Sequence, residues 1–148
     1  MRAAREAVVP DTVKAALERI FAAPVAHLKV IEDSWLTRLH GRAVATTRAR
    51  RIYLRGSAAQ FFVDPWLMLH EYCHVIRQWQ TGRLTVRGYL YECLKHGYWN
   101  NRFEIEARAF ADDNAARLRA LLALPVEPGR PTPSPAALRG DRGVRPPR

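Results

Sequence analysis

Residues 67–76 read LMLHEYCHVI and contain His70, Glu71 and His74 in the spacing His-Glu-x-x-His. Positions four apart lie on one face of a helix, so the two histidine side chains can bind one metal ion together. Glu71 lies about 100° further around the helix than His70, where its carboxylate can reach a water on the ion without being a ligand. The motif therefore predicts a zinc site with His70 and His74 as ligands and Glu71 as general acid/base, which are the requirements of peptide-bond hydrolysis.

The residues around the motif are almost all uncharged, which favours a helix that is buried on most sides. Burying two histidines is costly unless something compensates their polar nitrogens, and a metal ion does so. Cys73 is interpreted as a small buried side chain and not as a ligand. The uncharged positions are Leu67, Met68, Leu69, Tyr72, Cys73, Val75 and Ile76.

A third protein ligand is expected, because catalytic zinc sites hold three protein groups and keep one position open. Candidates lie further along the chain in the segment 101–109, where Glu104 and Glu106 are the carboxylates. Residues two apart point in directions roughly 200° apart on a helix, so only one of the two glutamates can face the site.

The two motifs together resemble those of the gluzincin zinc peptidases, which carry His-Glu-x-x-His on one helix and a glutamate on a later one. Their second motif is typically Glu-x-x-Ala or Glu-x-x-Ser followed by Asp or Asn, and residues 104–107 match its first four positions. The resemblance implies Glu104 as the third zinc ligand. Arg108 stands where the family often has the Asp or Asn that steadies a ligand histidine, so Glu106 stays open as the alternative.

A looser resemblance covers about residues 28–113. This region is similar to small bacterial metallopeptidase domains associated with contractile injection system cores. The shared features are Ala-x-Ala-x-Thr within residues 41–47, a second strand at 51–54, and a motif helix that continues through Val75 and Gln78. This implies a minimal gluzincin-like fold with a zinc site. The resemblance to gluzincins implies in addition that strand 51–55 is an edge that pairs with an extended substrate. Arg51 and Arg55 would then favour acidic substrate side chains, and the alternative is that they lie on a solvated face of the hairpin.

Apolar periodicity and turn residues predict the order of elements along the chain. Asp11 and Asn101 are expected to cap helices, Asp64 and Pro65 to open the motif helix, and Gly82 and Gly97 to end helices. The expected elements are a helix from 11 to Pro24, a strand at 27–32, a hairpin of 43–47 and 51–55, and helices over 64–80, 84–94 and 102–124.

These elements predict an α+β domain over residues 1–124, with a small antiparallel sheet packed on the His-Glu-x-x-His helix and on a C-terminal helix that bears the glutamate. The remaining residues 125–148 hold seven of the ten prolines and five arginines. Such a segment buries too little apolar surface to offset its ordering entropy, so a flexible tail is expected there.

The net charge is +10, from 24 Lys and Arg against 14 Asp and Glu. This balance is compatible with an acidic partner or a nucleic acid bound through the basic surface and tail, although the arginines are scattered along the sequence. No apolar run is long enough to span a bilayer, so no membrane is expected. With two cysteines and no apparent secretion signal, the default location is the cytoplasm.

The hypothesis that explains most of these observations is that the protein is a zinc-dependent metallopeptidase acting on a peptide or protein. The alternative is a zinc-stabilised module that binds protein or nucleic acid with weak or no catalysis. Tyr98 and His96, on either side of Gly97, are candidates to stabilise an oxyanion, and Tyr91 and Tyr72 compete for that role.

Overall fold

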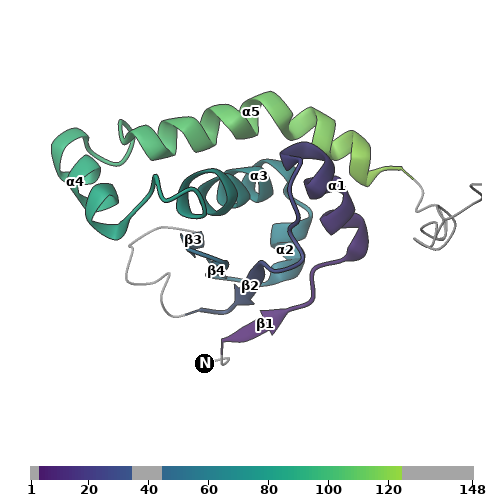
Figure 1. Ribbon diagram of the computed structural model, residues 1–148. Coiled ribbons are helices and arrows are strands. Elements are labelled where there is room, and N and C mark those ends of the chain that lie inside the picture. Colours follow the sequence, from purple (N-terminus) through teal and green to yellow (C-terminus); the bar gives the residue numbers. More distant parts are fainter. Residues whose placement is uncertain (1–3, 35–44, 125–148) are drawn as a thin grey trace, which may run out of the picture.

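The computed structural model describes residues 4–34 and 45–124, and these form an α+β fold (Figure 1). The predicted tail at 125–148 and the start of the predicted hairpin at 43–44 lie outside the described residues. Within the described ranges, a small sheet lies beside a central helix, and a long helix covers that helix on its other side.

The sheet has four strands in the order β1-β2-β4-β3. Strands β2 and β4 run parallel, with Val30 opposite Ile52, whereas the other two pairings are antiparallel. The prediction of an antiparallel sheet is therefore wrong: the sheet is mixed, because β4 turns back from β3 and inserts beside β2. The strands are β1 (Arg5–Ala7), β2 (Lys29–Glu32), β3 (Ala45–Arg48) and β4 (Arg51–Leu54).

Strand β4 is an interior strand, because β2 and β3 flank it on both sides. The expectation that residues 51–55 form the substrate-binding edge is therefore wrong, and β3 is the edge strand at that end of the sheet. The side chains of β4 alternate, since Ile52 and Leu54 are buried and Arg51 is exposed. Their burial places one face of the sheet on the core.

The helices follow the predicted order, with two additions. They are α1 (Asp11–Phe21), α2 (Ala58–Phe62), α3 (Pro65–Cys73), a π-helical turn η2 (His74–Trp79), α4 (Val86–His96) and α5 (Arg102–Leu122). Neither the short helix α2 nor strand β1 was predicted. The π-helical turn, which was also not predicted, begins at the second histidine of the motif.

Predicted helix caps are found at two of three positions. The Asp64 carboxylate accepts a hydrogen bond from the Leu67 backbone N–H at 3.0 Å, and Pro65 occupies the first helical position. The Asn101 side chain accepts from the Phe103 N–H at 2.9 Å. Asp11 is not a cap, because it is the first residue of α1 and so lies one position inside the helix. There its negative charge interacts favourably with the helix dipole.

Helix α3 lies between the sheet and α5, so it is buried on most sides, as its sequence predicts (Figure 1). The face of α5 that packs on it carries Phe103, Ala107, Ala111 and Leu118, which are all buried at helical spacing. Small alanines at two of these positions allow the two helix backbones to approach closely. Glu104 lies on this same side of α5 and is buried with them.

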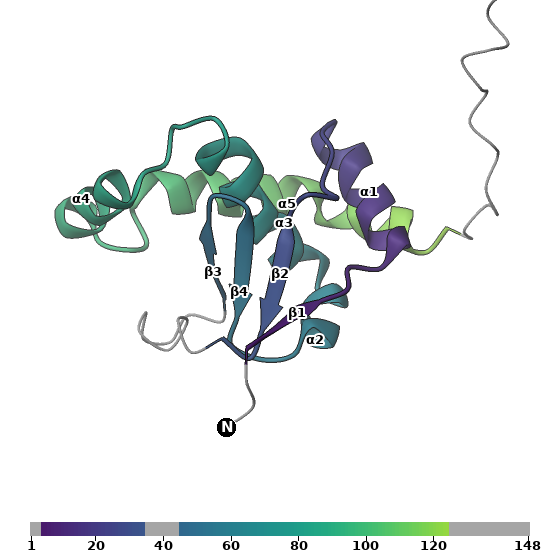
Figure 2. The same ribbon diagram turned by 60° about the horizontal axis from the view of Figure 1, so that its bottom comes forward.

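Helix α4 differs from the others, because none of its residues is buried. It lies at one end of α5, to the side of the sheet edge formed by β3 (Figure 2). Gly97 ends it with a φ of 75°, a left-handed value that glycine adopts without strain. Among the described residues, no helix has both the length and the apolar character to cross a membrane.

Candidate metal centre

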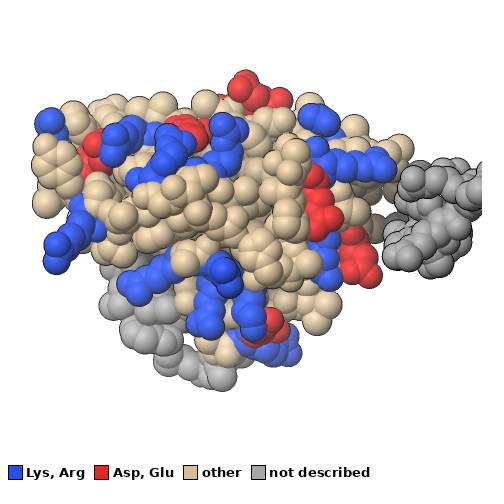
Figure 3. Space-filling model, viewed as in Figure 1, with Lys and Arg blue, Asp and Glu red and all other residues tan. Residues whose placement is uncertain are grey.

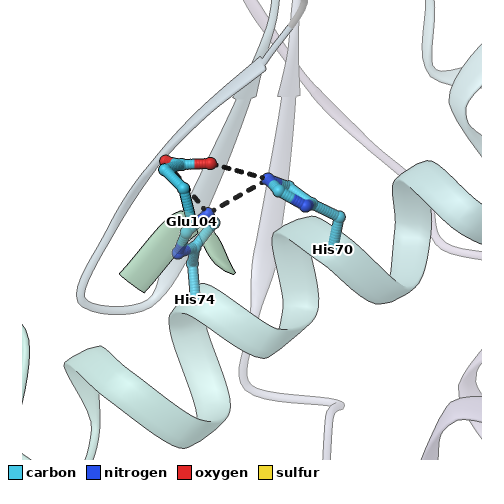
Figure 4. A group of neighbouring side chains, drawn as sticks. All are labelled: His70, His74 and Glu104. Carbon is cyan, nitrogen blue, oxygen red and sulfur yellow. Dashed lines mark hydrogen bonds and ion pairs between the residues drawn. The ribbon is translucent and has the colours of Figure 1, made fainter. Parts of the chain in front are cut away.

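His70, His74 and Glu104 meet at one point between α3 and α5 (Figure 4). The two imidazole Nε2 atoms are 3.2 Å apart. One Glu104 carboxylate oxygen lies 3.2 Å from His70 Nε2, and the other lies 3.5 Å from His74 Nε2. All three side chains are buried, and their ligand-type atoms converge from α3, η2 and α5.

This donor set fits a zinc ion. Ligand atoms placed about 2.0–2.1 Å from a tetrahedral ion lie about 3.3 Å from one another. Here the two histidine Nε2 atoms are 3.2 Å apart, and one ligand atom from each of the three residues lies within 4.8 Å of the others. One buried Glu104 oxygen forms the 3.2 Å ion-pair contact with His70 Nε2 but no regular hydrogen bond among the described residues, and a bound cation would complete its coordination. Two imidazoles and one carboxylate are also the ligand set of several catalytic zinc sites.

Glu104, and not Glu106, lies beside the histidines. Glu106 forms a two-point ion pair with Arg83, with both N–O distances 3.0 Å. Its side chain is about one-quarter exposed, whereas that of Glu104 is 4% exposed. The structure thus separates the two candidates in the way that their spacing of two residues requires.

Glu71 is buried beside the triad and lines the same cavity as His70 and His74. Burial raises the pKa of its carboxyl group above the usual glutamate value, and the nearby His74 and His70 only partly oppose that shift. A carboxylate with a raised pKa accepts and returns a proton more readily near neutral pH than an exposed one does. The structure thus places Glu71 beside the triad, with the pKa of its carboxyl group raised by burial.

His74 and Glu104 stabilise each other's charged forms. Burial lowers the pKa of His74, but the hydrogen bond to Glu104 and the charge of Glu71 outweigh it and leave the pKa raised. Burial raises the pKa of Glu104, but hydrogen bonds from His70 and His74 outweigh it and leave the pKa lowered. The Glu104 carboxylate is consequently ionised at neutral pH, as a metal ligand must be.

A cavity of about 360 Å³ opens over the triad. One wall is the edge strand β3, and the opposite side is apolar and formed largely by Leu84, Val86 and Leu90. Arg48, at the end of β3, is the arginine that lines the cavity, whereas Arg51 and Arg55 do not line it. The predicted acidic preference through those two arginines is thus not supported by their placement.

Of the four residues considered for oxyanion stabilisation, Tyr98 lines the cavity. Tyr72 is buried in the core, and neither His96 nor Tyr91 lines the cavity. Burial, together with the charge of Glu104, raises the pKa of the Tyr98 phenol. The phenol therefore keeps its proton and can donate a hydrogen bond.

Two site residues were not singled out from the sequence as parts of the centre. The Tyr89 hydroxyl donates to a Glu104 oxygen at 2.7 Å and lines the cavity. Gln78 lies 2.7 Å from His74 Nδ1 through its side-chain oxygen. The contact of Gln78 with His74 could have been predicted from the spacing of four residues on a helix. The contact of Tyr89 with Glu104 could not, because the two residues are 15 positions apart.

Cys73 is buried in the core, as predicted, and is not part of the triad. Burial raises the pKa of its thiol to about 12, so the thiolate that would bind metal is scarce at neutral pH. Arg108, which stands in place of the expected Asp or Asn, is directed elsewhere: it donates to the Trp99 carbonyl and lies over the Trp99 ring.

Comparisons with protein-family models, with curated proteins and with solved structures found no match for this chain. The protein is therefore defined by its α+β fold and by a buried His-His-Glu cluster that could hold a metal ion.

Proposed function

We propose that this protein is a zinc-dependent metallopeptidase of gluzincin type, with His70, His74 and Glu104 as zinc ligands and Glu71 as general acid/base. The observation that carries the proposal is the convergence of the three ligand atoms within 4.8 Å, with Glu71 beside them in one open cavity. A purely structural metal site needs no acid/base and no cavity.

Zinc in such a site supplies a Lewis acid that lowers the pKa of water and polarises a peptide carbonyl. The chain's own residues do the rest. Glu71 accepts the proton of the attacking water and delivers it to the leaving amine. Tyr98, which is half-exposed and lines the cavity, is the candidate donor to the oxygen of the attacked carbonyl.

The cavity also supports a substrate class. Among residues 4–34 and 45–124, edge strand β3 pairs with β4 alone, so its other side offers backbone groups to a peptide in extended form. Across the cavity, the apolar wall formed by Leu84, Val86 and Leu90 fits a bulky apolar side chain. We therefore expect peptides or unfolded protein segments with an apolar residue next to the cleaved bond.

The basic surface supports the binding alternative less well. Figure 3 shows Lys and Arg side chains on both the upper and the lower part of the face in view, with Asp and Glu side chains among them. Nucleic-acid sites normally gather positive charge on one face or stripe. The peptidase is therefore the better supported of the two functions.

The test measures metal content and peptide hydrolysis on the same tag-free proteins. Wild type, Glu71→Gln and Glu106→Gln are expected to hold about one zinc ion per chain, whereas His74→Ala and Glu104→Gln lose it. Hydrolysis is screened against a peptide library with varied apolar positions. Glu71→Gln should lower kcat by roughly 10²–10⁴-fold while keeping its zinc.

Three results would decide otherwise. A wild type that takes up no zinc contradicts the metal site itself. Zinc lost in Glu106→Gln but kept in Glu104→Gln contradicts the ligand assignment. Zinc bound as expected, with no hydrolysis of any library member, favours the zinc-stabilised binding module over the peptidase.

A further inference from the structure

Gln78 is a fully buried amide that joins the motif helix to α5 beside the metal centre. We infer that Gln78 is the positioning residue of this centre: it holds His74 in the tautomer whose Nε2 lone pair faces the ion, and thereby sets the zinc affinity. The inference rests on the proposed zinc site and adds to it a residue that touches neither metal nor substrate.

The orientation of the Gln78 amide is fixed by its surroundings. Its nitrogen lies 2.9 Å from the Phe103 backbone carbonyl and 3.4 Å from a Glu106 carboxylate oxygen. Both of these groups can only accept hydrogen bonds, so the atom that faces them must be the NH₂ group. The Gln78 oxygen is therefore the atom that lies 2.7 Å from His74 Nδ1.

That orientation determines the tautomer of His74. An amide oxygen can only accept, so Nδ1 must carry the proton that fills the short contact. In a neutral imidazole with Nδ1 protonated, Nε2 holds the lone pair. His74 Nε2 is the atom that lies 3.2 Å from His70 Nε2 and 3.5 Å from Glu104. The lone pair thus points to the place where the ion would sit.

The same contacts keep the two ligand-bearing helices in register. Gln78 lies in η2, directly after α3, whereas Phe103 and Glu106 lie in α5 on either side of Glu104. Glu106 is itself held by the two-point ion pair with Arg83. The two glutamates of α5 therefore have separate roles, since Glu104 faces the ion and Glu106 anchors the amide that orients His74.

This arrangement also accounts for Arg108. A ligand histidine needs a partner on its second nitrogen to fix its ring, and such partners usually matter 10–100-fold in metal affinity. Here the partner of His74 comes from η2, four residues after the histidine, and not from position 108 of α5. The Nδ1 atom of His70 has no hydrogen-bond partner among the described residues. Arg108 packs on Trp99 instead.

Three variants test the inference. Gln78→Met keeps the length of the side chain but removes its hydrogen bonds. Gln78→Glu keeps an acceptor for His74 Nδ1 and loses the donor to Phe103. Gln80→Met is the matched control, because Gln80 lies on the same turn and contacts His27, at 2.7 Å, away from the metal centre.

Two readouts are used, and neither depends on peptide hydrolysis. The first is the tautomer of His74 in the zinc-free protein at alkaline pH, read from the ¹⁵N resonances of its ring. The second is the zinc dissociation constant, from competition with a chromophoric chelator. Circular dichroism confirms that each variant is folded.

The expected result is an Nδ1-protonated His74 in wild type, in Gln78→Glu and in Gln80→Met, and a mixture of tautomers in Gln78→Met. The zinc dissociation constant should rise roughly 10–100-fold in Gln78→Met, less in Gln78→Glu, and stay unchanged in Gln80→Met.

An Nε2-protonated His74 in the wild type would overturn the inference, even if Gln78→Met failed to fold. So would an unchanged zinc affinity in a folded Gln78→Met. Loss of the peptidase proposal alone would leave both readouts as expected.

Discussion

Glu71 occupies a place that does not favour its charge. It is 6% exposed and close to a second carboxylate, Glu104, and burial is the main cause of its raised pKa. Nothing in the packing of α3 requires an ionisable group at this position, since its neighbours Tyr72 and Cys73 are buried and uncharged. A residue of this kind is usually retained for chemistry and at some expense in stability.

We expect Glu71→Gln to stabilise the zinc-free protein at neutral pH. Because the pKa of Glu71 is raised above 4.5 in the folded state, its contribution to stability is greatest below about pH 4.5 and is lost as pH rises through the folded-state pKa. The melting temperature of Glu71→Gln should therefore exceed that of wild type by a few degrees near pH 8, the shift expected for about 1 kcal/mol. The difference should shrink toward pH 4.5.

Scanning calorimetry of the two proteins across this pH range is the measurement. Glu106→Gln serves as the control, because its carboxylate is paired with Arg83 and its removal should destabilise the fold. A difference in melting temperature between Glu71→Gln and wild type that is independent of pH would show that the charge of Glu71 does not destabilise the fold.

At the scale of residues, the structure brings together the side chains that the sequence singled out. His70, Glu71 and His74 were identified from spacing alone, and Glu104 was favoured from the second motif. The choice over Glu106 had a further signal in Phe103, Ala107 and Ala111, the apolar face that Glu104 shares. Contacts such as Tyr89 with Glu104 could not be predicted, because they depend on how α4 is placed relative to α5.

Helix α4 is an unusual element, since it forms a wall of the cavity yet buries none of its residues. Leu90 is 55% exposed and lines the cavity, whereas Leu94, one turn further on, is 88% exposed and does not. The helix thus contributes little to the core and much to the surroundings of the centre.

We expect Leu90→Ser to lower kcat/KM roughly tenfold for peptides with a bulky apolar residue at the cleaved bond, and less for peptides with a small one. Leu94→Ser is the matched control and should leave kcat/KM unchanged. Both residues are exposed, so the free energy of unfolding should change by less than about 0.5 kcal/mol in either variant. Equal losses in the two variants would argue against α4 as a wall of the substrate site.

At the scale of elements, long periodic segments were predicted and short or non-local ones were not. The helices predicted from 11 to Pro24 and over 102–124 are close to the observed α1 (Asp11–Phe21) and α5 (Arg102–Leu122), because each has a long apolar stripe. The three-residue strand β1 and five-residue helix α2 are too short for periodicity to register. The position of β4 inside the sheet depends on pairing with β2, which no local pattern encodes.

Across the whole molecule, the candidate centre connects two parts of the chain that are distant in sequence. Two ligands come from the end of α3 and the start of η2, and the third comes from the first turn of α5 (Figures 1 and 4). A metal ion bound there would bridge the two helices that form the middle of the fold. Its binding energy is then available to the folded state alone.

We expect zinc at about 100 times its dissociation constant to stabilise the protein by about 2.7 kcal/mol, and so to raise its melting temperature by about 10 °C. Removal of zinc with a chelator should reverse the rise. His74→Ala should show no such rise, because it lacks one of the ligands. Thermal unfolding followed by circular dichroism with and without zinc checks this, and a wild type that melts at the same temperature in both cases would contradict it.

The order of the ligands along the chain has a consequence for how such a protein can change over generations. Helix α4 lies wholly between His74 and Glu104, inside a segment whose two ends meet at the centre, and none of the residues of α4 itself is buried. Lengthening a loop of this kind adds only about 0.6 kcal/mol for each doubling. Insertions and replacements around α4 can therefore reshape what the cavity accepts while the chemistry beneath it is inherited intact.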